Sequence, residues 1–131
     1  MKKKELIIGL FLFALISTSI WAWLQAGKPK APDTTFATIT GEILPLNTLS
    51  GKAVIVTFWA TTCPGCMKEI PHLIELYQQY HNQGLEIIAV AMSYDRPDQV
   101  IAMAKNKKMP YKIALDTKGL NAKAFGDIRL T

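Results

Sequence analysis

The pattern of apolar and polar positions divides the chain into an apolar N-terminal segment and a longer region of alternating strands and helices. Residues 6–24 carry no charge, and as a helix they would reach about 28 Å, close to the roughly 30 Å hydrocarbon thickness of a bilayer. Lys2, Lys3 and Lys4 precede this segment, which predicts a cytoplasmic N-terminus. We therefore expect a cytoplasmic tail over 1–5, a transmembrane signal-anchor over 6–24 and a domain outside the cytoplasm.

A cleaved signal peptide is the alternative for the same segment. Its apolar region would be residues 6–16, and Ser17-Thr18-Ser19 would be a weak cleavage site. The apolar character resumes at Ile20, and Trp21 and Trp23 suit the far membrane interface, so the pattern favours an anchor. Both interpretations export the rest of the chain.

Beyond a polar linker over residues 25–34, which holds Pro29 and Pro32, three apolar runs predict strands. The β-branched run 53–59 predicts a central strand buried on both faces, and 85–92 predicts a second buried strand. Residues 111–115 predict a short strand. Residues 36–43 alternate weakly around Gly41, which predicts an edge strand or a hairpin.

Helical patterns separate these strands. The longest predicted helix covers residues 64–80, with apolar side chains at helical spacing (Ile70, Leu73, Ile74 and Tyr77) and Pro71 inside it. Further helices are predicted over 97–108, with Asp95 as a candidate cap, and over 119–125. Strands that alternate with helices indicate an α/β fold with a mixed, mainly parallel sheet flanked by helices.

The net charge of +5 is concentrated near the N-terminus. Residues 1–30 hold five lysines and one glutamate, whereas residues 31–131 hold ten basic and nine acidic side chains. A nearly neutral domain has no electrostatic footprint for nucleic acid, so we expect no nucleic-acid partner.

The two cysteines of the chain form the motif Cys63-Pro64-Gly65-Cys66 at the predicted start of the longest helix. A disulfide across three residues constrains little of the unfolded chain, so its value as a structural staple is small. The unpaired N–H groups and partial positive charge of a helix N-terminus favour a thiolate at the more exposed cysteine. The motif therefore predicts a redox-active dithiol.

The run from Phe58 to Cys66, the Gly51-Lys52 pair before it and Glu69-Ile70-Pro71 after it resemble the TlpA/ResA-like branch of the thioredoxin superfamily. The resemblance implies a thioredoxin-like fold over residues 35–131. It also implies a Cys63–Cys66 redox disulfide in which Cys63 is the attacking nucleophile and Cys66 the resolving thiol. Supporting positions are Trp59 beneath the site, the intervening Pro64 and Gly65, and the helix-kinking Pro71.

Glu69 follows Cys66 by three residues, and the resemblance implies a role in tuning the thiols and moving protons. The alternative is a surface carboxylate. Thr62 stands where the family usually has tryptophan. Because the chain stops at Thr131, about where the family's cis-proline loop should begin, we expect the C-terminal hairpin and helix to be lacking.

The resemblance implies a membrane-anchored enzyme on the periplasmic side of the inner membrane that reduces protein disulfides without a cofactor. Its electrons would come from a membrane thiol donor, and its clients would serve cytochrome c maturation or copper sites. Gly65 adds no charge that would make the dithiol strongly oxidising, which favours the reductase direction.

Three alternatives use the same residues differently. A copper-binding module would need more ligands than Cys63 and Cys66, and only His72 and His81 could add to them, so we expect no metal site. A thiol peroxidase would need threonine and proline where this chain has Ala60 and Val56. The third is an interaction domain in which the disulfide is only structural.

Overall fold

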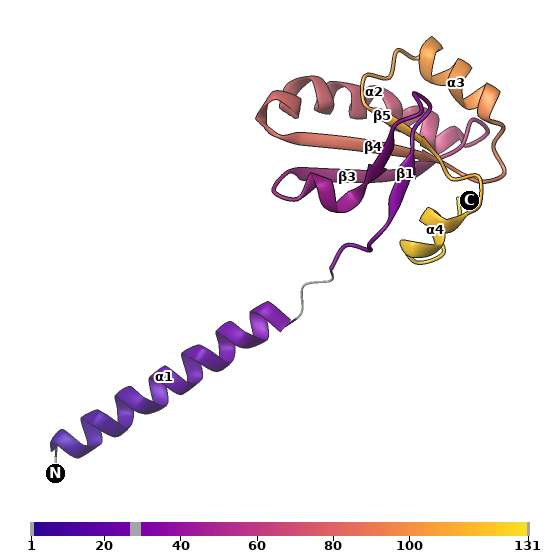
Figure 1. Cartoon of the computed structure of the whole chain (residues 1–131). Helices are drawn as coiled ribbons and strands as arrows, with labels where there is room; N and C mark the ends of the chain where they lie inside the picture. The colour runs from indigo at the N-terminus through magenta and orange to yellow at the C-terminus, as the bar shows by residue number, and fades with distance from the viewer. Residues whose placement is uncertain (1, 27–29, 131) are drawn as a thin grey trace. The chain divides into compact units, whose positions relative to one another are not determined.

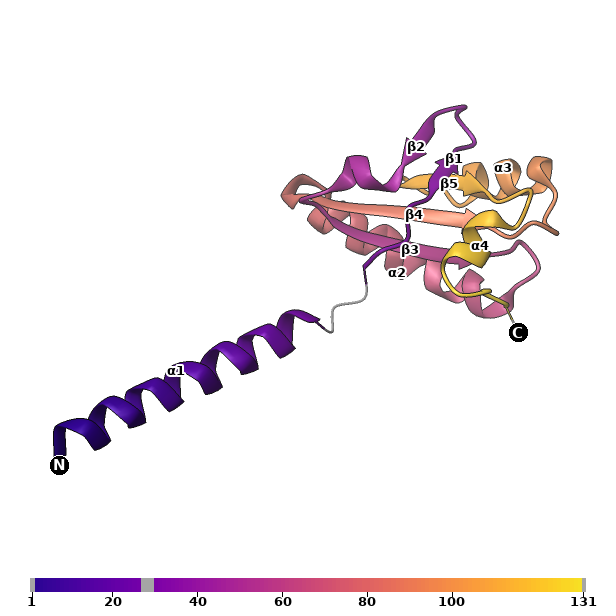
Figure 2. The ribbon, with the colours of Figure 1, turned by 60° about the horizontal axis from the view of Figure 1, so that its bottom comes forward.

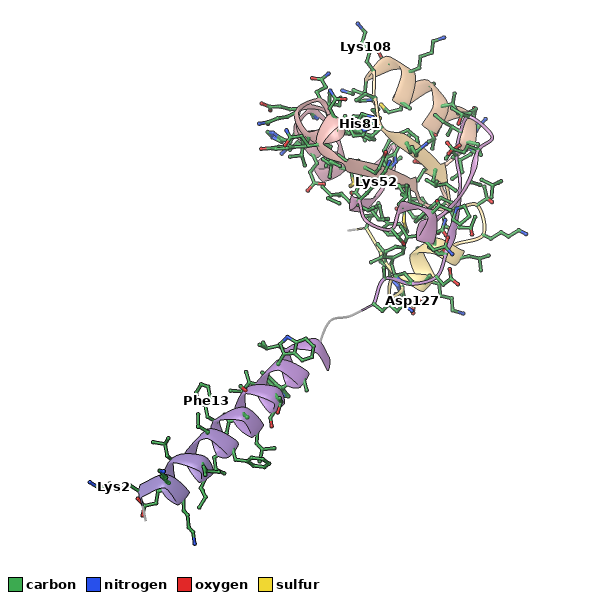
Figure 3. The ribbon with its side chains drawn as sticks, turned by 60° about the vertical axis from the view of Figure 1, so that its left-hand side comes forward. Lys2, Phe13, Lys52, His81, Lys108 and Asp127 are labelled. Carbon is green, nitrogen blue, oxygen red and sulfur yellow. A yellow bond between two sulfur atoms is a disulfide. The ribbon has the colours of Figure 1, made fainter. Side chains whose placement is uncertain are left out.

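A computed structural model describes residues 2–26 and 30–130, in two units that comprise residues 1–31 and 32–131. Pro29 of the predicted linker and the final Thr131 lie outside the described residues. The N-terminal unit is helix α1 (Lys2–Ala26), and its apolar side chains are exposed, as Phe13 illustrates (Figure 3). Its segment Lys2–Leu24 is long and apolar enough to cross a membrane.

The second unit is built on a parallel sheet of three strands in the order β3 (Ala53–Trp59), β4 (Leu85–Ala91), β5 (Lys112–Leu115). Figure 2 looks onto this sheet. β3 and β4 are paired from Ala53 opposite Leu85 to Trp59 opposite Ala91. The carboxyl ends of both strands therefore lie side by side. This parallel arrangement agrees with the α/β, thioredoxin-like fold that the sequence predicts.

The central strand is β4, and the prediction that residues 53–59 form a central strand buried on both faces is wrong. Every residue of β4 is buried, whereas β3 is mostly half-buried and pairs with β4 on one side only. None of the described residues pairs with the other side of β3. A continuous apolar run therefore identified a strand here but not its place in the sheet, because both strands carry such a run.

One face of the sheet is covered by α2 (Pro64–Tyr80) and α3 (Pro97–Asn106). Three side chains of the predicted apolar stripe of α2, Leu73, Ile74 and Tyr77, pack against this core. The core is built around Trp59, Ile87, Val100 and Tyr111. A 3₁₀ turn, η2 (His81–Gln83), follows α2 and ends at Gly84, whose φ of 97° lies in the left-handed region that glycine adopts without strain.

The opposite face is covered by the hairpin β1 (Thr35–Ala37) and β2 (Ile43–Pro45), by the 3₁₀ turn η1 (Leu46–Leu49) and by the segment around α4 (Leu120–Ala124). The hairpin confirms one of the two predictions for residues 36–43. Phe125, directly after α4, contacts the rings of Phe36 and Phe58. These contacts close a second apolar core around Ile88 and Val90. Figure 1 shows the helices and strands of this unit with their labels.

The ends of α3 differ from the prediction. The helix stops at Asn106 rather than at residue 108, where Lys108 has a positive φ of 52°. Its N-cap is Arg96, which makes no side-chain capping bond, so the prediction that Asp95 caps this helix is wrong. The Asp95 carboxylate binds another loop, as described below.

Candidate functional site

The two cysteines lie where β3 ends and α2 begins. A four-residue turn from Ala60 to Cys63, closed by a 3.1 Å hydrogen bond from the Cys63 N–H to the Ala60 carbonyl, joins the two elements. Cys63 and Cys66 are bonded as a disulfide, with their Cα atoms 5.3 Å apart. Both residues are half-buried, so the disulfide borders solvent at the edge of the sheet where the parallel strands end.

Cys63 is the N-cap residue of α2. Its backbone is extended (φ −92°, ψ 105°), and its Sγ atom accepts a 3.2 Å hydrogen bond from the N–H of Cys66. That N–H is one of the donors that the first turn of a helix leaves without a partner. Because a thiolate accepts such a bond more strongly than a thiol, this position stabilises the ionised form of Cys63 once the disulfide opens.

Pro64 and Gly65 complete the first turn of the helix. Pro64 occupies the first helical position, where its missing N–H costs no hydrogen bond. A Cβ atom added at Gly65 would have no heavy atom within 4 Å, apart from its neighbours in the chain and helix. Packing therefore does not require glycine between the cysteines, because the space that a side chain at position 65 would enter is open.

Of the predicted supporting residues, Trp59 lies in the core and Pro71 on α2. Trp59 is buried, and Cys66 packs against the core cluster that includes it. The indole Nε1 of Trp59 is buried and has no hydrogen-bond partner among the described residues. Pro71 lies inside α2, where it has no N–H to donate to the carbonyl of Met67.

Glu69, His72 and His81 are exposed. Glu69 stands on α2 three residues after Cys66, and its side chain is exposed in this disulfide form. The ring of His81 stacks on Tyr77 with the two centroids 4.4 Å apart. Within residues 2–26 and 30–130, no group of three or more His, Cys, Asp or Glu side chains is placed to hold a metal ion.

Asp95, a candidate cap of α3 by its position in the sequence, instead binds the turn that leads to the cysteines. Its carboxylate accepts two hydrogen bonds of 2.6 Å from Thr61, one from the N–H and one from the hydroxyl. A signal was available, since Thr61 and Asp95 each follow one of two neighbouring parallel strands, whose carboxyl ends meet at one edge of the sheet.

Hollows on the surface of the domain include one beside the cysteine loop and one at the other end of the sheet. A shallow one of 500 Å³ borders Thr61 and is otherwise lined by side chains of α3. A larger one of 640 Å³ lies where β4 and β5 begin, lined by Glu86, Lys112 and the end of α2. Of these two hollows, the smaller adjoins the loop that carries the cysteines.

Comparison with known proteins extends the resemblance to most of the chain. Residues 28–129 match the model of the AhpC/TSA family. The chain is 32% identical to the thiol-disulfide oxidoreductase ResA of Halalkalibacterium halodurans, over 92% of this chain and 73% of that protein. It is also 32% identical to the thioredoxin-like protein YneN of Bacillus subtilis, over 91% of this chain and 76% of that protein.

Comparison with solved structures also finds thiol–disulfide exchange proteins. A thiol:disulfide interchange protein of the thioredoxin family from Chlorobium tepidum matches 79% of this chain and 71% of its own, with 28% identity and a TM-score of 0.69. The positions that matter for a peroxidase hold apolar residues here: Ala60 is fully buried and Val56 lies within β3. The methyl group of Ala60 cannot donate the hydrogen bond that a threonine hydroxyl would offer to a bound peroxide.

Proposed function

Because this chain belongs to the AhpC/TSA family and, within it, to the ResA-like thiol–disulfide oxidoreductases, we propose that it reduces disulfides of client proteins outside the cytoplasm while anchored in the membrane. The observation that carries the proposal is the placement of the Cys63–Cys66 disulfide at the N-terminus of α2, half-buried and bordering solvent. Thiol–disulfide exchange needs an accessible sulfur that ionises readily, and this position supplies both.

In the proposed reaction the reduced enzyme meets a client disulfide. The Cys63 thiolate attacks one client sulfur, the client S–S bond breaks, and a mixed disulfide forms as the other client sulfur leaves as a thiolate. The Cys66 thiolate then attacks Cys63 Sγ, which closes the Cys63–Cys66 disulfide and releases the second client sulfur. Two electrons pass to the client, both of its sulfurs are protonated, and the enzyme is left in the oxidised form described above.

Surrounding residues support this chemistry in distinct ways. The N–H of Cys66 stabilises negative charge on Cys63, Pro64 starts the helix without a wasted donor, and Gly65 leaves the approach to the sulfurs open. Trp59 would support the site from the core against which Cys66 packs, and Pro71 from further along α2. Glu69, exposed on the same helix, would exchange protons with solvent when the client thiolates leave.

The proposal assigns residues 1–5 to the cytoplasm, 6–24 to the membrane, 25–34 to a linker and 35–131 to the catalytic domain. The length and apolar character of Lys2–Leu24 support the anchor, and the lysines before it support the orientation. An enzyme held there would be re-reduced by a membrane dithiol, and its clients would be exported proteins such as apocytochrome c or copper-site proteins.

Two experiments test the proposal. The full chain, in detergent micelles, is equilibrated with reduced and oxidised glutathione, and we expect a reversible two-electron equilibrium together with dithiothreitol-driven reduction of insulin. In whole cells, a membrane-impermeant maleimide should label the cysteines after reduction. A disulfide that dithiothreitol cannot open would overturn the redox assignment, and a dithiol that stays reduced throughout the glutathione range would overturn the reductase direction. Labelling that requires cell lysis would overturn the location.

A further inference from the structure

The Asp95 carboxylate joins the loop after β4 to the turn before the cysteines. Its Oδ2 accepts a hydrogen bond from the Thr61 N–H, and its Oδ1 accepts one from the Thr61 hydroxyl, both at 2.6 Å. Hydrogen bonds to an ionised carboxylate are stronger than those between neutral groups, and two of them fix direction as well as distance. Thr61 is therefore held at both its backbone and its side chain.

The turn that Asp95 binds would otherwise have a free donor. In the turn from Ala60 to Cys63, the bond from the Cys63 N–H closes the ring, and the N–H of Thr61 takes no part in it. The loop that carries Asp95 is itself attached to β3, because the Met92 N–H donates to the Trp59 carbonyl and the Asp95 N–H donates to the Met92 carbonyl, both at 3.0 Å. The loop that carries the Asp95 carboxylate is thus fixed to the end of β3, the strand that leads into the turn.

The turn decides where the sulfur of Cys63 lies. It ends on Cys63, whose extended backbone allows Sγ to accept the bond from the Cys66 N–H. While the disulfide is closed, the S–S bond also holds the two cysteines together. In the reduced state that bond is gone, and only the turn and the helix keep Cys63 Sγ at the N-cap position.

We propose that Asp95 is a positioning residue for the dithiol: through Thr61 it holds the turn from Ala60 to Cys63 so that the Cys63 thiolate keeps its hydrogen bond from Cys66. The inference rests on the proposed redox function. Asp95 also carries a negative charge, and by charge alone it would disfavour a thiolate nearby. If Asp95 acts by position, removing its carboxylate should make the Cys63 thiolate less stable; if it acts by charge, removal should make the thiolate more stable. This difference makes the proposal testable.

The test compares Asp95→Ala and Thr61→Val with Asp98→Ala. Asp98 is a matched control, because it is an exposed carboxylate three residues away that pairs with Arg96 and has no bond to the turn. Iodoacetamide alkylation of reduced Cys63 is measured in a Cys66→Ser background, and the glutathione equilibrium is measured with both cysteines present. Urea unfolding of each variant shows whether it folds.

For Asp95→Ala we expect alkylation at pH 7 to slow about tenfold and the glutathione equilibrium to shift about tenfold toward the disulfide, which is about 30 mV for this two-electron couple. Thr61→Val, which loses one of the two bonds, should shift both quantities less and in the same direction. Thr61→Ser, which keeps the hydroxyl, should match the unaltered chain, and Asp98→Ala should stay within about twofold of it.

Faster alkylation in Asp95→Ala would mean that charge, not position, is the role of Asp95, and values equal to those of Asp98→Ala would mean that it has none at the dithiol. Either result overturns the inference. Should Asp95→Ala fail to fold, the pair Thr61→Val and Thr61→Ser decides by the same two readouts. Failure of the proposed function is a separate outcome, because it would be seen as a redox-inert dithiol in the unaltered chain.

Discussion

The ammonium group of Lys52 lies 2.9 Å from Oε1 of Glu86 and joins the turn before β3 to the beginning of β4. The Glu86 side chain is only 8% exposed, whereas that of Lys52 is 46% exposed. The second carboxylate oxygen, Oε2, is buried and has no hydrogen-bond partner among the described residues. Lys52 is thus the main neutralising contact of a buried charge, at the end of the sheet far from the cysteines, where His81 also lies (Figure 3).

Removing the cation should therefore cost more than a surface pair would. We expect Lys52→Met to lower the free energy of unfolding by about 1–3 kcal/mol, because it leaves a buried carboxylate without its partner. Lys112→Met is the control, since it breaks a more exposed pair with Glu42 and should cost under about 1 kcal/mol. Urea denaturation measures both, and equal costs would show that Glu86 does not depend on Lys52.

Substitution of each cysteine in turn should show which sulfur attacks the client and which one resolves the mixed disulfide. Cys63→Ser should abolish insulin reduction, because the attacking sulfur is gone. Cys66→Ser should instead accumulate a mixed disulfide with the client, because the resolving sulfur is gone. Non-reducing gel electrophoresis, followed by mass spectrometry of the adduct, detects the difference. Adducts that form through Cys66 in the Cys63→Ser chain would reverse the assignment.

The open space at Gly65 allows a change in redox direction to be tested. Gly65→His should fit without displacing a neighbour, and an imidazolium beside Cys63 would stabilise the thiolate. A stabilised thiolate stabilises the reduced form, so the reduction potential should rise by about 30 mV or more. Gly65→Ala controls for the loss of glycine. If Gly65→His and Gly65→Ala have the same reduction potential, the imidazole does not reach the sulfur.

Tyr111, through its buried hydroxyl, should make the domain less stable at high pH. Its side chain is buried, its hydroxyl has no hydrogen-bond partner among the described residues, and burial raises its pKa to about 12. The folded chain therefore holds this proton more tightly than the unfolded chain, whose tyrosine has a pKa near 10. Stability is unaffected by this group below pH 10 and falls as the pH rises from about 10 to 12.

Tyr111→Phe should remove that part of the alkaline loss. At pH 7 it should leave stability unchanged or raise it by up to about 1 kcal/mol, because it removes a buried hydroxyl without a partner. Tyr94→Phe, at an exposed tyrosine, is the control. Urea unfolding at pH 7 and pH 11 measures both, and a destabilised Tyr111→Phe at pH 7 would mean that the hydroxyl has a partner in solution.

Local sequence patterns predicted most elements to within a few residues. Strand 53–59 and helix 64–80 have the predicted limits, because an apolar run, the Cys63-Pro64 helix start and Gly84 after the helix each act over a few neighbouring residues. The dithiol could be found for the same reason, since its two cysteines are close in sequence and the helix start between them is a local feature.

The roles of Asp95 and β3 could not be found in this way. Asp95 has the right position to cap α3, yet it binds Thr61, 34 residues earlier, because two parallel strands bring their following loops together. β3 has the composition of a central strand, yet it lies at the edge of the described sheet, because strand order depends on pairing between segments far apart in the chain.

By itself, then, the sequence determined the apolar N-terminal helix, the alternation of strands and helices, and the pair of cysteines at a helix start, all of which depend on backbone propensity and the spacing of apolar side chains. The tertiary structure alone decided which strand is central, which carboxylate supports the dithiol turn and which cation neutralises Glu86. These depend on contacts between residues more than twenty positions apart, whose geometry exists only after the strands have paired.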